Sequence, residues 1–292
     1  MSEISSVEHV IVTPCRDHHE IFSLFDSIVA QTVLPVQWVI VLHNLTDIDR
    51  VKITNHAKQF DWITIIRVED SSTRKRGAQI ARLVNIGISE INHNWTYLSK
   101  IDADMILQSE YFEKIFRKFS ENEKLGIASG VCHLVENDVK YIEKVSKNHT
   151  RGGLKTYRKQ CFVDIRGIRE VDGWDGIDNI AAQINGWETS NFDDIPALHS
   201  RRTGSYNGLI NGCFEAGKFA YAMRYSFPFL VARSIHRMLR KPFFIGGVSM
   251  FFGYLKAALH RTPQSLSDQE KKYLRKLQRR RLIAIGADFK KR

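Results

Sequence analysis

The fold is decided by residues 10–47, VIVTPCRDHHEIFSLFDSIVAQTVLPVQWVIVLHNLTD. An apolar run from Val7 to Pro14, rich in β-branched residues, predicts a buried strand, and the apolar periodicity from Ile21 to Ala30 predicts a helix. A second apolar run, Gln37 to Leu42, predicts another buried strand. Strand, helix and strand therefore follow one another, as in a unit with two parallel strands.

The same alternation continues along the chain. Further strands are predicted at 63–68, 97–101 and 126–135, and further helices at 49–59, 78–91 and 111–121. Strands that alternate with helices predict the α/β class, with a mostly parallel, doubly wound sheet flanked by helices. In such a sheet, ligands bind outside the carboxyl ends of the strands.

An acidic motif, Asp102-Ala103-Asp104, follows the predicted strand YLSKI at 97–101. Two carboxylates one residue apart in a turn can both reach one divalent cation, and that cation can bridge a diphosphate. Short acidic pairs also occur by chance in surface turns. The position after a central strand favours the metal-binding interpretation.

Positive charge is concentrated at one end of the chain. The 292 residues carry a net charge of +11, but residues 1–200 contain 23 Lys/Arg against 28 Asp/Glu, whereas residues 201–292 contain 20 against 4. A basic region of net +16 indicates an anionic partner, either lipid head groups or nucleic acid. The amino terminus lacks a secretory signal pattern, which predicts a cytoplasmic protein. The four cysteines have no zinc-site spacing.

The basic region divides the predicted organisation into a catalytic domain at 1–205 and a helical, basic and aromatic extension at 206–292. Residues 229–241 predict an amphipathic helix with Val231, Ile235 and Met238 on one face and arginines on the other. The apolar stretch 243–255 has 13 residues, fewer than the roughly 20 that span a bilayer. A charged helix is predicted at 269–281. We therefore expect a region that lies on a membrane, with a helical lid or an oligomer interface as the alternative.

The chain resembles the family 2 glycosyltransferases, which are inverting enzymes of the GT-A fold. The resemblance is carried by residues 10–47, by GAQIARLVNIGISEI at 77–91 and by YLSKIDADMI at 97–106, and it extends over about residues 7–205. It implies a nucleotide-sugar donor, with UDP as the expected nucleotide, and Mn²⁺ or Mg²⁺ held by Asp102 and Asp104. Asp102 would also contact the donor.

The resemblance assigns further donor-binding residues near the first two strands. Thr13, Pro14 and Arg16 would border the nucleotide, and Asp47 lies where the family often contacts the base or ribose. The family commonly has an acidic residue directly after the second strand, whereas this chain has His43-Asn44. A solvated loop cation at Arg16 and a turn or helix cap at Asp47 are the structural alternatives.

The catalytic base is expected in GWDGIDNIAAQINGWET, residues 173–189, which resembles the family segment with an acidic residue at the start of a helix. An inverting displacement needs a carboxylate within reach of the acceptor hydroxyl. Asp175 and Asp178 are both candidates, and the family pattern favours Asp178. The alternative is that Asp175 caps the helix and Asp178 occupies its first turn.

The segment PALHSRRTGS, residues 196–205, resembles a histidine-containing loop that follows the base in part of the family. His199 would complete the metal shell, and Arg201 and Arg202 would neutralise the departing diphosphate. The resemblance, together with the basic carboxyl-terminal region, implies transfer of a sugar to a lipid-linked or polysaccharide acceptor by a peripheral enzyme on the inner face of the membrane.

Two other functions fit part of the sequence. Sugar nucleotidyltransferases share the architecture, but TPCRDHHE at 13–20 is not their glycine-rich phosphate loop. A nucleic-acid-binding protein would use the basic region, but its aromatic residues lie in apolar stretches instead of forming a stacking platform. We therefore expect no nucleic-acid partner.

Overall fold

The computed structural model describes residues 7–16, 18–71, 77–136, 139–142, 146–199 and 208–290. The chain divides into two compact units, residues 1–201 and residues 202–292. The predicted boundary between 205 and 206 falls in the stretch 200–207, outside the described residues.

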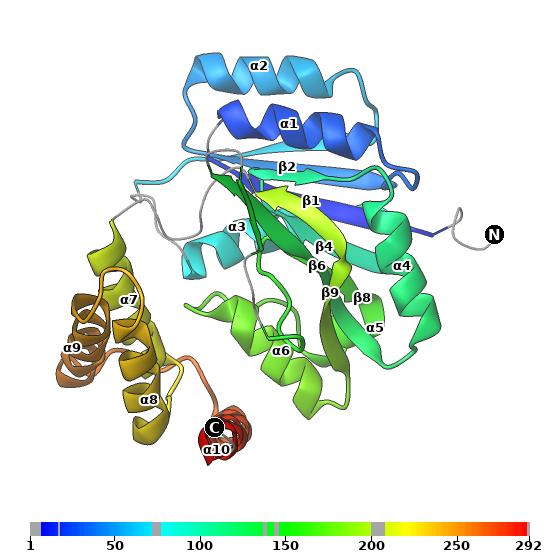
Figure 1. The fold of residues 1–292 in the computed structure, drawn as a ribbon. Coiled ribbons are helices and arrows are strands. Elements are labelled where there is room, and N and C mark those ends of the chain that lie inside the picture. The colour runs from blue at the N-terminus through cyan, green and yellow to red at the C-terminus, as the bar shows by residue number, and fades with distance from the viewer. Residues whose placement is uncertain are drawn as a thin grey trace. The chain divides into compact units, whose positions relative to one another are not determined.

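The first unit is built on one nine-stranded sheet with the order β3-β2-β1-β4-β8-β6-β9-β5, in which β7 pairs with β6 (Figure 1). The strands are β1 His9–Cys15, β2 Gln37–His43, β3 Ile63–Val68, β4 Tyr97–Ile101, β5 Met105–Leu107, β6 Leu125–Glu136, β7 Val139–Ile142, β8 Leu154–Arg158 and β9 Glu188–His199. The α/β class is therefore confirmed.

The sheet is wholly parallel in its amino-terminal half and mixed in the rest. β1, β2, β3 and β4 pair in parallel, as their intervening helices require. β8 then pairs antiparallel with both β4 and β6, and β9 is parallel to β6 and antiparallel to β5. The expectation of a mostly parallel sheet holds for the first four strands and is corrected for the rest, where the sheet is mixed.

Helices cover both faces of this sheet. They are α1 His18–Val29, α2 Asp47–Ala57, α3 Ala78–Ser89, α4 Tyr111–Glu121, α5 Lys159–Asp164 and α6 Trp174–Ile184. Residues of α1, α2 and α4 join one buried cluster, and residues of α3, α5 and α6 join the other. The first unit is therefore a three-layer α/β/α structure.

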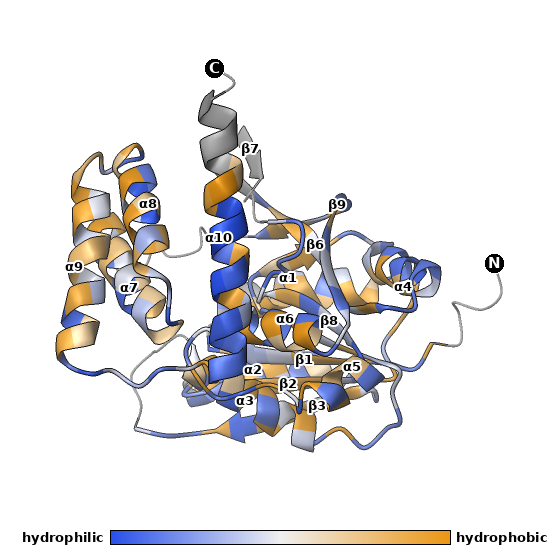
Figure 2. Cartoon of the chain, turned by 90° about the horizontal axis from the view of Figure 1, so that it is seen from below, coloured by the Kyte–Doolittle hydropathy of each residue, from blue (hydrophilic) through white to orange (hydrophobic). Residues whose placement is uncertain are grey.

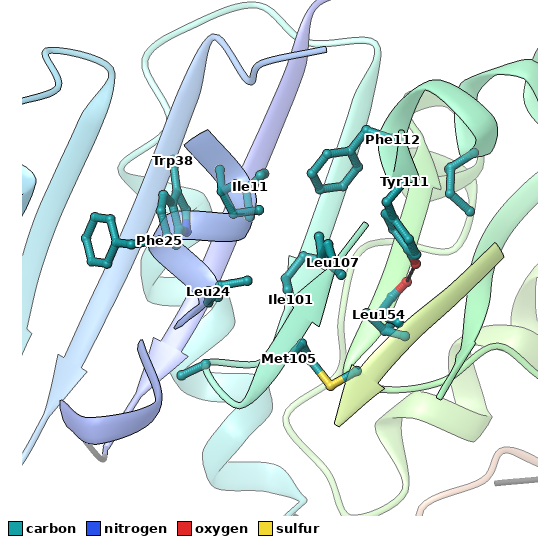
Figure 3. Packing of buried hydrophobic residues seen from close by; sticks show 14 of the residues in the cluster. Ile11, Leu24, Phe25, Trp38, Ile101, Met105, Leu107, Tyr111, Phe112 and Leu154 are labelled. Carbon is teal, nitrogen blue, oxygen red and sulfur yellow. Dashed lines mark hydrogen bonds between the residues drawn. The ribbon is translucent and has the colours of Figure 1, made fainter. Parts of the chain in front are cut away.

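Alternate residues of the central strands supply the two cores. In β1, Ile11 packs on the α1 side and Val12 on the α3 side, and both are fully buried. The Phe25 ring of α1 lies 4.7 Å from the Trp38 ring of β2, inside the first cluster (Figure 3). Burial on both faces explains why these strands are continuously apolar in the sequence.

The second unit consists of α7 Leu209–Ala222, α8 Phe227–Met238, α9 Ile245–Leu259 and α10 Asp268–Lys290. α7 and α9 approach closely through two glycines. A Cβ added at Gly217 would lie 1.9 Å from the Met250 carbonyl oxygen, and one at Gly253 would lie 2.0 Å from the Phe214 carbonyl oxygen. Only glycine allows the two backbones to come this near.

The predicted amphipathic helix forms as α8. Leu230 and Ser234 are its buried residues, whereas Ile235 is 55% exposed. The apolar stretch 243–255 lies largely in α9, and the charged helix lies in α10. In the part of the chain that the structure describes, no helix is both long enough and apolar enough to cross a bilayer.

Candidate active site

The carboxyl ends of β1, β2, β3 and β4 lie at one edge of the sheet, because these strands are parallel. Asp102 and Asp104 follow β4 at this edge. Pro14 and Arg16 lie at the end of β1, and Asp47 begins α2 a few residues after β2. The fold therefore brings the acidic motif and these three residues to the same edge.

Asp102 is held by a lysine of the preceding strand. Lys100, which is 2% exposed, forms an ion pair with the Asp102 carboxylate and donates a hydrogen bond to the Gly152 carbonyl at 2.8 Å. The backbone N–H of Asp102 donates to the Gly153 carbonyl at 3.0 Å. Desolvation raises the pKa of Asp102, and the charge of Lys100 lowers it by a smaller amount, so the pKa is raised overall. The Asp102 side chain is 34% exposed.

Asp104 is paired with a histidine from a distant strand. His199 Nε2 lies 3.1 Å from Asp104 Oδ2, because the end of β9 pairs with the start of β5. Burial alone would raise the pKa of Asp104, but the hydrogen bond and charge of His199, together with the charge of Lys100, outweigh it and lower the pKa. The structure thus joins two residues that are 95 positions apart.

The Asp104 carboxylate is suited to bind a divalent cation that is also coordinated by a phosphate ligand. Asp104 Oδ1 is buried and accepts no hydrogen bond from any residue in the described ranges. Within those ranges, no group of three or more His, Cys, Asp or Glu is arranged to hold a metal ion. Because Mg²⁺ is commonly held by one or two carboxylates together with substrate phosphates, such a site needs the ligand to be complete.

Two glycines lie between Asp102 and the second acidic segment. A Cβ added at Gly153 would lie 2.8 Å from Asp102 Oδ2, and one at Gly152 would lie 3.0 Å from Asp175 Oδ2. Both carboxylates therefore approach the same dipeptide. The sequence interpretation missed these glycines, and their only signal is the adjacent pair within the aperiodic stretch before β8.

Asp178 is enclosed in the core of the first unit. Its side chain is 3% exposed and forms an ion pair with Lys155, which is fully buried. It also accepts hydrogen bonds from the Tyr157 hydroxyl at 2.5 Å and from the backbone N–H of Asn179 at 2.6 Å. Burial raises the pKa of Asp178 and lowers that of Lys155. This environment does not fit the preference for Asp178 as the base, because an acceptor hydroxyl has no access to it.

Asp175 is the more accessible of the two predicted carboxylates. It lies in the first turn of α6 and is partly exposed, and Gly173 occupies the N-cap position that the sequence interpretation offered to Asp175. Its carbonyl accepts hydrogen bonds from Lys155 Nζ at 2.5 Å and from Asn179 Nδ2 at 2.8 Å. The buried groups therefore fix the backbone of Asp175 and leave its carboxylate at Gly152.

Lys100 and Lys155 form a buried cationic pair that the sequence interpretation also missed. They face each other across β4 and β8. Their ammonium groups lie 5.4 and 5.7 Å from the centre of the Trp174 ring, which is itself buried. The ring stabilises both cations from one side, so Trp174 packs beneath the site. The available signal was one lysine within each of the short segments YLSKI and LKTYR.

The residues at the end of β1 have different environments. Thr13 is fully buried, and its hydroxyl accepts a hydrogen bond from the Trp38 indole at 2.9 Å. The Thr13 side chain is therefore part of the core. Pro14 and Arg16 are partly exposed, and Arg16 Nη1 lies 3.4 Å from Gln79 Oε1 of α3.

A cavity of about 470 Å³ opens beside the ends of β2 and β3. Asp47, Arg50, Arg67 and Asp70 are among its lining residues. The Asp47 side chain is 86% exposed and pairs with Arg50. Asn44 exchanges two hydrogen bonds with the backbone of Asp70, at 2.9 and 3.0 Å, which fixes the wall of the cavity. Arg201 and Arg202 lie outside the described residues.

This architecture is shared with solved glycosyltransferase structures. No protein-family model and no curated protein sequence matches the chain. The mannosyltransferase PcManGT from Pyrobaculum calidifontis, in complex with GDP-Man and Mn²⁺, is 14% identical with a TM-score of 0.56, over 97% of this chain and 80% of that one. TarS 1-349 from S. aureus is 10% identical with a TM-score of 0.53, over 88% of this chain and 73% of that one.

The TarS structure in complex with UDP gives a TM-score of 0.53 and 12% identity over 74% of this chain, which spans 64% of that structure. At these identities the likeness concerns the fold alone. The chain therefore has a glycosyltransferase fold of the GT-A type.

Proposed function

We propose that this protein is an inverting, metal-assisted glycosyltransferase that moves a sugar from a nucleoside diphosphate sugar to an acceptor hydroxyl. The observation that carries the proposal is the approach of Asp102 and Asp175 to one glycine dipeptide, next to the Asp104–His199 pair. A metal-and-diphosphate site and a candidate base then face the same small region. That juxtaposition is what a displacement at an anomeric carbon requires.

Two kinds of likeness support the proposal. The sequence resembles the family 2 glycosyltransferases in residues 7–205, and the fold is similar to that of PcManGT in complex with GDP-Man and Mn²⁺ and of TarS in complex with UDP. We propose a UDP-sugar as the donor. The cavity beside β2 and β3 would take the nucleoside, with Asp47 at its rim and Pro14 and Arg16 toward the diphosphate. Thr13 would contribute through its backbone, because its side chain is buried.

Asp104 would hold Mn²⁺ or Mg²⁺ together with the donor diphosphate, with Asp102 and His199, the other two ligands expected from the sequence, beside it. A bound divalent cation neutralises charge that develops on a departing diphosphate. Arg201 and Arg202 are proposed for the same leaving group. Lys100 keeps the Asp102 carboxylate in place from the buried side.

We propose Asp175 as the general base, in place of Asp178. The acceptor hydroxyl would give its proton to the Asp175 carboxylate while its oxygen bonds to the anomeric carbon. The bond from that carbon to the diphosphate breaks at the same time, and the nucleoside diphosphate leaves with the electron pair. Asp178 acts through Lys155, which fixes the Asp175 carbonyl, and is therefore a positioning residue.

The proposed acceptor is lipid-linked or part of a polysaccharide, at the inner face of a membrane. This part of the proposal rests on residues 201–292, which contain 20 Lys/Arg against 4 Asp/Glu. Such an excess favours residence at an anionic surface. The alternative hypothesis is that the same region forms a lid or an oligomer interface.

Isothermal titration with UDP and GDP tests the donor site, with Mn²⁺ and with EDTA. The variant is Asp102→Asn/Asp104→Asn, and the matched control is Glu121→Gln/Glu123→Gln, an exposed pair with the same spacing. We expect metal-dependent binding in the wild type and the control and at least a hundredfold loss in the variant. Equal binding by variant and control would overturn the proposed site.

A further inference from the structure

Large apolar side chains are exposed mainly on the second unit. Thirteen of the eighteen exposed large apolar residues in the described ranges belong to it, although it holds fewer than a third of the chain's residues. Single exposed apolar residues need no explanation, but a concentration of them marks an interaction surface. The second unit therefore has a surface that its own core leaves uncovered.

The most exposed of these residues lie at the end of α8, in the turn that follows it and along α9. We define the α8–α9 apolar surface by Leu239, Phe243, Phe244, Val248, Phe252 and Leu259, which are exposed by 70%, 55%, 72%, 42%, 58% and 84%.

On α9 the members of this surface follow helical spacing. Val248, Phe252 and Leu259 are spaced by four and seven residues and are exposed, whereas Met250, Gly253 and Ala257 are buried. α9 is thus apolar on both faces (Figure 2). The inner face, which includes Gly253, packs against α7. The outer face, with Val248, Phe252 and Leu259, is exposed to solvent.

The charges near this surface are all positive. Residues 216–267 contain no Asp or Glu, and the acids at either end, Glu215 and Asp268, pair with Lys218 and Arg224. Arg240 and Lys241 are exposed immediately before Phe243 and Phe244. An apolar surface bordered by cations is complementary to a surface that is both anionic and apolar.

A bilayer with anionic head groups has that chemistry. Aromatic and aliphatic side chains enter the boundary between head groups and acyl chains, while lysine and arginine contact phosphate. A second copy of the chain would bring like charges together. A nucleic acid would leave the aliphatic members of the surface without a partner.

We propose that the α8–α9 apolar surface inserts into an anionic membrane interface and holds the protein there without a spanning helix. This inference deepens the membrane association within the proposed function by naming its surface. It requires no sugar donor, so it can be tested without any nucleotide.

Flotation of the full-length protein with vesicles of neutral phosphatidylcholine, and of phosphatidylcholine with phosphatidylglycerol, tests the proposal. The apolar variant is Leu239→Gln/Phe244→Gln, and its matched control is Ile48→Gln/Val51→Gln, which alters exposed apolar residues of the first unit. The charge variant is Arg240→Glu/Lys241→Glu, and its control is Lys124→Glu/Lys147→Glu, which changes the net charge equally.

We expect the wild type and both controls to bind the anionic vesicles and to bind neutral vesicles weakly. The apolar variant should bind at least about tenfold more weakly, and the charge variant at least about fivefold more weakly, with the remaining binding reduced by salt. Circular dichroism and UDP titration of each variant show that it remains folded and that the donor site is unaffected.

Two results would overturn the inference. One is equal vesicle binding by the apolar variant and its control. The other is absence of vesicle binding by the wild type, together with a dimer in sedimentation velocity that the apolar variant converts to a monomer. Absence of UDP binding by the wild type would contradict the proposed donor site. The vesicle result would still test the membrane surface, because vesicle binding requires no nucleotide.

Discussion

Two lysines that face each other on β4 and β8 each form an ion pair with an aspartate, Asp102 after β4 and Asp178 in α6, and the two pairs differ mainly in the exposure of the carboxylate. In the pair Lys100–Asp102 the carboxylate keeps 34% of its exposure, whereas in Lys155–Asp178 it keeps 3%. The first pair lies at the carboxyl ends of the parallel strands, where α/β sheets generally bind ligands, and the second lies within the core. The difference teaches that residue type and spacing do not assign a role to an acid, because burial decides whether it can meet a substrate.

The largest effect should separate Asp175 from the buried acid. With Asp175→Asn we expect the turnover number to fall by about 10² to 10⁴, because an amide cannot accept the proton of the acceptor hydroxyl. UDP affinity should stay within about twofold. Turnover and titration on one preparation check both parts. Full activity in Asp175→Asn would show that another residue is the general base.

A stability comparison tests the buried pair. Lys155→Met and Asp178→Leu should each lower the free energy of unfolding by about 3 to 5 kcal/mol, because each leaves a buried partner without compensation. The double variant should be close to the wild type or more stable than either single variant. Urea denaturation measures all three proteins.

The exposed pair provides the matched control. Lys100→Met should cost less stability than Lys155→Met, because the partner that it leaves, Asp102, is partly solvated. Its main effect should be weaker binding of UDP in the presence of Mn²⁺. Equal stability losses in the two lysine variants would show that the difference in exposure has no energetic consequence.

Stability at mildly acidic pH should depend on His9 of β1, which contacts the neighbouring strand β4. His9 is fully buried, lies 2.9 Å from Ser99 Oγ, and has a pKa lowered by burial to about 3 from an ordinary 6.5. Between pH 6.5 and 3, His9 is therefore protonated in the unfolded chain but not in the folded chain. The free energy of unfolding should fall in this window as pH falls, by at most about 1.4 kcal/mol per pH unit from this residue.

Urea denaturation at pH 7, 6, 5 and 4 measures this slope. We expect a shallower dependence in His9→Gln, which keeps a hydrogen-bonding side chain without a titratable group. An unchanged slope in His9→Gln would show that protonation of His9 is not the cause of the acid sensitivity.

The smallest effects should come from the two glycines, and they should differ in kind. Gly153→Ala would push on Asp102 and should weaken metal-dependent UDP binding about threefold to tenfold. Gly152→Ala would push on Asp175 and should lower the turnover number with little change in UDP affinity. Titration and turnover assays on both variants check this division, and the same parameter changing in both would contradict it.

The first half of the fold could be predicted from the sequence because its strands are buried on both faces and alternate with helices. The antiparallel half could not, since Leu154–Arg158 and Glu188–His199 mix polar and apolar residues and their pairing depends on distant partners. Asp102 and Asp104 were recognisable from their place after a strand. The sequence analysis favoured Asp178 over Asp175 as the base, because spacing alone does not show which side of a helix faces the core.

Crystals soaked with UDP and Mn²⁺, with anomalous diffraction measured at the manganese edge, test the central claim most directly. The account predicts a manganese peak within coordination distance of Asp104 and of the UDP diphosphate, with Asp102 beside it and the uracil in the cavity near Asp47. Nucleotide bound elsewhere, or a diphosphate with no peak beside Asp104, would contradict it.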